Sequence, residues 1–388
     1  MIDYEYVAKE FKTPMYIYDI NELYRRVNYL KSKFDKSVKL IYAVKANTFI
    51  SKEVDALVEK HEICSPGEFE ICKSLNISYD KMVISGVYKD YKFIENLISN
   101  YDINRYTIES INHYNILSDL ATKYNKKLNV LVRITSGNQF GVSEEDLKYI
   151  LKNNKNLEIK GIEYFSGTQK HSIKKINKEI DYLVELIKNI ENEYKINLSE
   201  VEYGPGLPVF YYEDEIFNED EFLKEVNEAL MKIKDKKVLL EIGRSIAASC
   251  GNYLTSVVDL KSNKNGNFAI VDGGINHLVY YGSTLAMKIP HLDVLPNRKD
   301  EKDIYNIYGS LCTINDVLVK NLNIRKLNIN DIFIFKNVGA YSSTEGISLF
   351  LSRDLPKIII FNKNGKYLLV RDIIKTSEIN KPIYRSEE

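Results

Sequence analysis

The chain has 388 residues, of which 44% are hydrophobic and 28% charged, and its 54 basic and 54 acidic side chains give a formal net charge of zero. This length exceeds one ordinary domain, and the composition is that of a globular protein with ample material for a core. The balanced charge gives no bulk attraction to nucleic acid or to a membrane surface, so we expect neither as a partner.

The four cysteines, Cys64, Cys72, Cys250 and Cys312, follow neither a metal-binding spacing nor a disulfide framework. We therefore expect no metal and a reduced, cytoplasmic compartment. The N-terminal segment MIDYEYVAKEFKTP carries acidic residues and lacks the apolar core of a signal peptide. No apolar run approaches the roughly 20 residues that a transmembrane helix needs.

Short apolar, β-branched runs alternate with amphipathic, helix-like segments from about residue 16 to residue 250. The apolar runs include VKLIYAVKA, KMVIS, LNVLVRI, IKGIEYF, LSEVEYG and KKVLLEIG. The helix-like segments include INELYRRVNYLKSKF, SKEVDALVEKH, GEFEICKSL, SEEDLKYILKNN and INKEIDYLVELIKNIENEY. About eight such strand–helix units predict an α/β fold, a (β/α)8 TIM-like barrel, over residues 23–250.

After residue 250 the pattern changes to short strands separated by Gly, Asn and Asp turns, and long helical patterns nearly vanish. The strands include NYLTSVVDLKS, GNFAIVDGG, DIFIFKNVG, PKIIIFNKNG and KYLLVRDII. This texture predicts a C-terminal all-β domain. The segment TPMYIYD precedes the first barrel helix and is predicted as a strand of the same domain, which then comprises residues 1–22 and 251–388.

The segment IYAVKAN places Lys45 at the end of a buried apolar strand, where an ammonium is costly to bury. At the C-terminal end of a barrel strand this lysine would face the active-site mouth. A lysine with a depressed pKa can form a Schiff base there. On spacing alone, a lysine that simply leaves the strand into solvent is the more frequent explanation.

Two further motifs follow apolar strands. In YGPGLP, Gly204 and Gly206 would let backbone N–H groups approach a phosphate closely, although a plain turn is the commoner reason for such a segment. In LLEIGRS, Glu241 and Arg244 could form a structural salt bridge or could divide the binding of a cofactor between them.

The motifs GSLCTINDV and VGAYSSTEG lie in the predicted β domain. Alone, Cys312 would be a small buried hydrophobe and Tyr341 one of many aromatic residues. Taken in order with the barrel motifs, however, they resemble the fold-type III pyridoxal-5′-phosphate (PLP) decarboxylases, which include diaminopimelate, ornithine and arginine decarboxylases. The resemblance runs from TPMYIYD to GKYLLVRDII, nearly the whole chain.

The resemblance implies PLP as the cofactor, with Lys45 as its Schiff-base lysine and Glu241 at its pyridine nitrogen. It further implies a cofactor site formed by Arg133, Phe165, Thr168, Gly204, Gly206, Arg244 and Tyr341. The last five of these would lie at or near the phosphate. Cys312 is implied as a catalytic residue that reaches the site of a neighbouring subunit in a head-to-tail homodimer, and Asp316 follows it in the same motif as a tentative substrate residue.

Three positions depart from the family pattern. Phe165 stands where the family usually has a histidine on the ring face, so no proton role of that histidine carries over. Pro205 replaces the middle glycine of the triplet and has no N–H to donate to phosphate. Thr313 follows the cysteine where related diamine-forming enzymes place an acid against the distal ammonium, and a neutral hydroxyl cannot offset the desolvation of that charge.

The segments VDGGINHL, CTIND and GAYSSTEGISLFLS are similar to a branch that acts in antibiotic and siderophore pathways, including an enzyme for glutamyl groups tethered to a carrier protein. We therefore expect decarboxylation of an amino acid or an amino-acid derivative, free as a small molecule or linked to a carrier protein. The leading alternative is a meso-diaminopimelate decarboxylase in which another acid, such as Glu345, replaces the missing charge. A PLP-homeostasis protein is disfavoured because such chains lack the β domain, and a barrel without cofactor is the least favoured.

Overall fold

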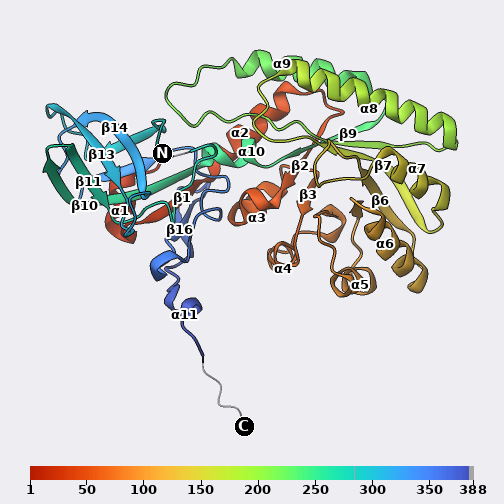
Figure 1. Cartoon of the computed structure of the whole chain (residues 1–388), viewed down its shortest axis with the longest axis horizontal. Helices are drawn as coiled ribbons and strands as arrows, with labels where there is room; N and C mark the ends of the chain where they lie inside the picture. The colour runs from red at the N-terminus through yellow and green to blue at the C-terminus, as the bar shows by residue number, and fades with distance from the viewer. Residues whose placement is uncertain (284, 384–388) are drawn as a thin grey trace, which may run out of the picture. The chain divides into compact units, whose positions relative to one another are not determined.

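A computed structural model describes residues 1–283 and 285–383 of the chain. The backbone separates into two compact units, each with its own sheet (Figure 1). One unit comprises Tyr24–Pro208 and Phe217–Ile246, and the other comprises Met1–Leu23, Val209–Ile216 and the chain from Ala247 onward.

The first unit contains a closed barrel of parallel strands in which the last strand pairs with the first. The barrel strands are β2 (Lys39–Ala43), β3 (Lys60–Ile63), β4 (Met82–Ile84), β5 (Arg105–Ile108), β6 (Leu128–Arg133), β7 (Leu157–Phe165), β8 (Glu200–Gly204) and β9 (Lys237–Ile242). Because the strands are parallel, their carboxyl ends meet at one mouth of the barrel.

Helices precede, connect and follow the barrel strands, as strand–helix alternation requires. They are α2 (Ile20–Lys33), α3 (Ser51–Asp55), α4 (Pro66–Ser74), α5 (Tyr91–Asn100), α6 (Ile111–Lys123), α7 (Glu144–Asn153), α8 (Ile173–Tyr194), α9 (Glu219–Leu230) and the short α10 (Arg244–Ala247). The long α8 begins after Ser172, whose side chain caps the backbone N–H of Lys175, and it buries a stripe that includes Ile176, Ile180 and Leu183. Figure 1 shows α8 lying alongside α9.

The second unit is built on a mixed sheet. Its strands are β1 (Met15–Asp19), β10 (Gly251–Asn263), β11 (Gly266–Val271), β12 (Leu292–Leu295), β13 (Lys302–Tyr308), β14 (Val317–Arg325), β15 (Ile332–Phe335), β16 (Lys357–Phe361) and β17 (Tyr367–Arg371). Its helices are α1 (Tyr4–Phe11) and α11 (Ser377–Asn380). The N-terminal β1 lies between β10, to which it is antiparallel, and β16, to which it is parallel. Met15, Ile17, Leu254 and Ile359 pack in the core of this unit.

The predicted architecture, a (β/α)8 barrel with a β domain that includes an N-terminal strand, is therefore confirmed. One predicted helix needs correction, because SKEVDALVEKH ends as a helix at Asp55 and enters β3 at Lys60. The alternation of buried and exposed residues expected of a half-buried strand is missing there, since His61 and Glu62 are both buried although they are adjacent in the strand. Among the described residues, no helix combines the length and apolarity needed to span a bilayer.

Candidate active site

The barrel residues proposed from the sequence gather at the carboxyl ends of the strands. They are Lys45 in the turn after β2, Arg133 at the end of β6, Phe165 at the end of β7, Gly204 at the end of β8, Glu241 near the end of β9 and Arg244 at the start of α10. Thr168 and Gly206 lie in the loops that follow β7 and β8. This mouth is where (β/α)8 enzymes carry their active sites.

Lys45 lies between carboxylates from the two strands that flank β2. Its Nζ donates a hydrogen bond to Glu62 Oε2 on β3 at 2.7 Å and to Glu241 Oε1 on β9 at 3.2 Å. The Glu62 and Glu241 side chains are 2% and 8% exposed, whereas the Lys45 side chain is 40% exposed. The amine is therefore held by buried carboxylates and remains open at the barrel mouth.

Burial changes the protonation of three glutamates inside the barrel. It raises the pKa of Glu241 to about 7, with the neighbouring Glu62 acting in the same direction. It also raises the pKa of Glu163 on β7 to about 7, against the opposing effect of Arg133. Burial and the surrounding carboxylates raise the pKa of Glu202 on β8 well above its usual range. The barrel interior thus binds protons that free carboxylates would release at neutral pH.

Arg133 provides positive charge on the other side of the mouth. Its Nη1 donates to Glu109 Oε2 at 3.0 Å, and its Nε lies 3.5 Å from Glu163 Oε1 in an ion pair. The guanidinium carbon lies 4.8 Å from the centroid of the Phe140 ring and 5.9 Å from that of the Phe165 ring. The guanidinium is therefore fixed by both carboxylates and aromatic faces.

The loops after β7 and β8 approach each other closely. Arg244 Nε donates to Thr168 Oγ1 at 3.3 Å, so two residues predicted to bind phosphate are in contact. Gly206 has φ of +59°, and a Cβ there would lie 2.2 Å from the carbonyl oxygen of Gly167. A Cβ on Gly204 would lie 2.3 Å from the Phe165 ring. Both positions therefore require glycine for a close backbone approach.

The remaining predicted residues, Cys312, Thr313, Asp316 and Tyr341, lie in the β-domain unit. Cys312 is exposed, and it lines a cavity of about 600 Å3 together with Thr313. The other lining residues are Lys261, Asn263, Phe268, Ile270, Tyr308, Gly309, Leu311 and Ile314. Tyr341 has φ of +66°, and its carbonyl oxygen accepts from the backbone N–H of Glu345 at 3.0 Å.

Asp316 is buried and binds backbone rather than an open cavity. Its Oδ1 accepts from the N–H of Ile275 at 2.8 Å, and its Oδ2 accepts from the N–H of Leu311 at 2.7 Å. These bonds join the VDGGINHL segment to the loop that carries Cys312. The geometry is that of a residue that positions the loop.

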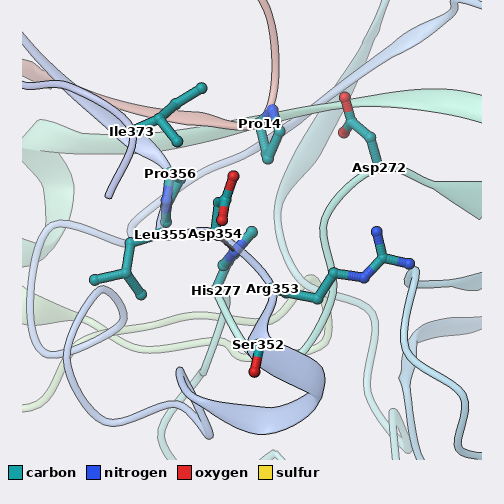
Figure 2. A pocket seen from close by; sticks show the side chains of 9 residues that line it. All are labelled: Pro14, Asp272, His277, Ser352, Arg353, Asp354, Leu355, Pro356 and Ile373. Carbon is teal, nitrogen blue, oxygen red and sulfur yellow. Dashed lines mark hydrogen bonds between the residues drawn. The ribbon is translucent and has the colours of Figure 1, made fainter. Parts of the chain in front are cut away.

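A second cavity of the β-domain unit, of about 320 Å3, contains none of the predicted site residues. Figure 2 shows Asp272 and Arg353 on one side of it and Leu355, Pro356 and Ile373 on the other. Asp272 Oδ1 accepts from Thr255 Oγ1 at 2.6 Å and from the N–H of Ser256 at 2.9 Å. These hydrogen bonds give Asp272 a structural role. The cavity is therefore not a better candidate for the active site than the barrel mouth.

The profile of a family described as "Pyridoxal-dependent decarboxylase, pyridoxal binding domain" matches residues 20–248, the whole barrel with Lys45, Glu241 and Arg244. The chain belongs to the pyridoxal-dependent decarboxylases. The cofactor of this family is PLP, which the motif order had implied. The matched span of this decarboxylase includes every barrel residue that the sequence had proposed for the cofactor site.

Similar proteins cover nearly the full decarboxylase chain. The L-glutamyl-(BtrI acyl-carrier protein) decarboxylase of Niallia circulans is 27% identical over 94% of this chain and 92% of its own length. The diaminopimelate decarboxylase of Campylobacter jejuni is 26% identical over 88% of this chain and 89% of its own length. The solved diaminopimelate decarboxylase of M. jannaschii has a TM-score of 0.85 at 23% identity and covers 99% of this chain and 95% of that one, which shows the shared fold.

The barrel mouth of the decarboxylase fits PLP. An exposed amine, Lys45, faces the mouth. Arg133 Nε and Glu163 Oε1 are buried and form an ion pair with each other at 3.5 Å, but neither has a hydrogen-bond partner among the described residues. The Thr168–Arg244 contact and the closely packed turn at Gly206 offer a hydroxyl, a guanidinium and backbone for a phosphate. A cradle of a guanidinium, a hydroxyl and backbone beside a reachable lysine is the kind of donor set that PLP requires.

Several residues at this mouth escaped the sequence motifs. Glu62 lies in the short strand β3, whose sequence resembled the end of a helix. Glu163 lies in the apolar run IKGIEYF, where a charged residue indicates a functional site. Glu109 follows β5 in the same way. An acidic residue in or directly after a buried strand was the signal that could have identified these residues, because an ionised carboxylate is costly to bury without a partner.

Proposed function

We propose that this decarboxylase removes the α-carboxylate of an amino acid or amino-acid derivative whose distal end is neutral or anionic. An amide-linked amino acid, or one tethered to a carrier protein, has this chemistry. The proposal combines the family with the cavity beside Cys312 and Thr313, the two residues that the sequence motif assigned to catalysis and to the substrate.

The composition of that cavity carries the proposal. Its described lining residues include one cation, Lys261, and no carboxylate. Phe268, Ile270 and Leu311 make much of its surface apolar. A substrate with a distal ammonium would lose water there without gaining an opposite charge, at a cost of several kcal/mol per ion. A neutral or anionic distal group avoids this cost.

The names of the relatives include both candidate substrates. The Niallia circulans enzyme is named for a glutamyl group on an acyl-carrier protein, in agreement with a tethered substrate. Several relatives are diaminopimelate decarboxylases, which keeps meso-diaminopimelate as the second candidate. That candidate needs an acid near Thr313, and Glu345 lines another cavity that shares no described lining residue with the one beside Thr313.

Lys45 is proposed as the residue that holds PLP covalently. When bound, PLP delocalises the negative charge that remains after CO2 departs. Lys45 must lose a proton before its amine can react, and Glu62 Oε2, 2.7 Å away, is placed to accept that proton. Glu62 and Glu241 also fix the direction of the Lys45 side chain at the barrel mouth.

The other barrel residues are proposed to bind and orient. Glu241 would pair with the protonated pyridine nitrogen, and the positive charge would lower its raised pKa again. Thr168, Gly206 and Arg244 would hold the phosphate, with Gly204 nearby and Tyr341 contributed by the β domain. Phe165 would stack on the ring, and Arg133 would lie beside it.

Cys312 is proposed to hold, on its thiol, the proton that replaces the carboxylate on the product's α-carbon. Its exposure suits a role in the site of a neighbouring subunit, so we propose a homodimer with shared active sites. We also propose the domain limits 23–250 and 1–22 with 251–388. The division of the backbone into two units agrees with them to within a few residues, except that residues 209–216 group with the β-domain unit. The cytoplasmic location expected from the cysteines stays a prediction.

The substrate prediction is tested by kcat/KM on a panel of free and carrier-linked amino acids. We expect free lysine, ornithine and meso-diaminopimelate to be poor substrates, and a glutamyl group on a carrier protein to be better. A Thr313→Glu variant should improve the diamine-forming substrates, because it supplies the missing charge. A wild-type kcat/KM of about 10⁴ M⁻¹s⁻¹ or more for meso-diaminopimelate would make the second candidate the answer.

A further inference from the structure

A buried ion pair lies beneath the two loops proposed to hold the phosphate. Lys170 Nζ donates to Glu179 Oε2 on α8 at 2.7 Å, and the two side chains are only 3% and 7% exposed. Desolvation lowers the pKa of Lys170, and Glu179 counteracts it. A buried pair of this kind is a weak source of stability, because the cost of removing both ions from water offsets most of their attraction.

The contacts of the pair converge on the loops after β7 and β8. Lys170 Nζ also donates to the carbonyl oxygen of Gly204 at 3.2 Å, and Lys170 N donates to that of Gly206 at 2.8 Å. Glu179 accepts from Tyr203 Oη on β8 at 2.6 Å and from Ser166 Oγ after β7. One ion pair thus ties both loops to helix α8.

This support matters because the phosphate cradle has few donors. Pro205, between the two glycines, has no N–H, so the cradle depends on Gly206, Thr168 and Arg244. Thr168 is two residues from Lys170, and a Cβ on Gly206 would come within 3.0 Å of Lys170 Cε. A small shift of either loop would therefore separate the remaining donors from the phosphate.

We propose that Lys170, paired with Glu179, is a positioning residue that fixes the loops at Thr168 and Gly206 for the phosphate of PLP. It touches neither the cofactor ring nor the substrate in this role. Its ammonium N–H groups point toward Glu179, Tyr203 and Gly204. The inference rests on the proposed phosphate site, so its test has to separate the two.

The test compares the dissociation constants of PLP and of pyridoxal, which lacks the phosphate, by equilibrium dialysis. Both compounds use the same lysine, so their ratio reports the phosphate site alone. In the double variant Lys170→Met/Glu179→Leu the charges are replaced by apolar groups of similar size, a change that buried pairs often tolerate. We expect weaker PLP binding by about tenfold, the scale of one charged hydrogen bond, and unchanged pyridoxal binding.

The matched control is Arg105→Met/Glu200→Leu. Arg105 and Glu200 form a largely buried ion pair at the first residues of β5 and β8, and so at the opposite end of the barrel. This variant should keep the wild-type ratio. If the Lys170 double variant does not fold, Lys170→Gln is measured instead, with an expected loss of PLP affinity of about threefold.

Equal dissociation constants of PLP and pyridoxal for the wild type would overturn the proposed phosphate site and this inference with it. Clear wild-type discrimination that survives unchanged in the Lys170 variants would overturn the inference alone. Equal weakening of both ligands in the Lys170 variants would also overturn it, because a general structural role would then explain the pair.

Discussion

At the scale of single residues, burial decides the charge of the glutamates inside the barrel. Glu163, Glu202 and Glu241 lie on three successive strands, and burial raises the pKa of each. A carboxylate that is removed from water holds its proton more tightly unless a cation compensates. Arg133 and Lys45 compensate in part, so a cationic ligand at this site would change how many protons the barrel binds.

Glu241→Gln tests the proposed contact with the pyridine nitrogen. We expect the variant to bind PLP but to turn over about tenfold more slowly or worse, because a charge-assisted contact becomes a neutral one. The measurement is kcat at saturating substrate, together with the visible spectrum to verify that PLP is bound. Unchanged kcat would show that the protonation of the ring does not depend on Glu241.

Glu163→Gln tests the raised pKa of the buried glutamate on protein freed of PLP. The pKa rises on folding to about 7, so the folded state binds the proton more tightly than the unfolded chain. The resulting stability is complete at low pH and is lost as the pH rises from about 5 to about 8. The glutamine at position 163 cannot titrate. The variant should therefore lose less unfolding free energy than the wild type over this pH range, by on the order of 1–3 kcal/mol in denaturant unfolding.

Glu158→Gln is the control for this comparison. Glu158 lies on the same strand, β7, but it is exposed, and its contact with Lys160 lowers its pKa. This variant should keep the wild-type loss of stability between about pH 5 and 8. Identical pH curves for the wild type and Glu163→Gln would contradict the proton bound at Glu163.

At the scale of elements, the ends of the strands and the loops after them make the site, while the strands themselves supply rigidity. Each barrel strand is only three to nine residues long, but its carboxyl end is fixed by neighbours on both sides. The loops after β7 and β8 are held by glycine contacts and by the pair beneath them. The precision of the proposed phosphate site therefore depends on loop packing.

Gly206→Ala tests that packing. The new methyl group would meet the carbonyl oxygen of Gly167 at 2.2 Å, and the backbone would stay at a positive φ. We expect at least tenfold weaker PLP binding and a loss of unfolding free energy of roughly 1–3 kcal/mol. The measurements are PLP titration and denaturant unfolding.

Gly365→Ala provides the matched control for Gly206. Gly365 also has a positive φ, +73°, but an added Cβ would meet nothing within 4 Å. This variant should show the cost of backbone strain alone and should leave PLP affinity unchanged. Equal PLP binding by both variants would argue against a close approach at Gly206.

At the scale of the whole molecule, the proposed site draws on both units. Lys45 and Glu241 come from the barrel, whereas Cys312, Thr313 and Tyr341 come from the β-domain unit. In a homodimer with shared sites, each site would combine the Lys45 of one chain with the Cys312 of the other. This arrangement makes activity a property of the assembly.

Mixing two inactive variants tests the shared site. Lys45→Ala should lack a borohydride-reducible PLP adduct, and Cys312→Ala should lack the proposed proton donor. After subunit exchange, half of the dimers are hybrids with one native site of two, so we expect roughly a quarter of wild-type activity. Lys45→Ala mixed with Glu241→Gln is the control. It should restore nothing beyond the activity of Glu241→Gln alone, because both residues belong to the barrel half of a site and every hybrid site therefore has one altered barrel. A fully active monomer would contradict the proposal.

The amino-acid pattern was enough to predict the barrel, the β domain with its N-terminal strand, the family and the cofactor. Strand–helix alternation and the order of the motifs carry this information locally, since hydrophobic periodicity and glycine turns are properties of short segments. The positions of Lys45 and Glu241 at strand ends followed from the same reasoning, whereas Arg133 was implied by the family resemblance. The boundaries of the short, polar β3 did not, because a strand buried inside a barrel has no alternation to detect.

Which side chains meet could not be predicted from the sequence, because it depends on how the chain folds over long distances. Glu62 and Glu241 are 179 residues apart in sequence, yet both bind Lys45 because β3 and β9 flank β2 in the closed barrel. Lys170, which follows β7, donates a hydrogen bond to Gly204 at the end of β8, although the whole of helix α8 separates them in sequence. Asp316, expected near the substrate, instead accepts hydrogen bonds from backbone N–H groups. Charge, burial and pKa depend on such long-range neighbours, and closure of the barrel is what brings them together.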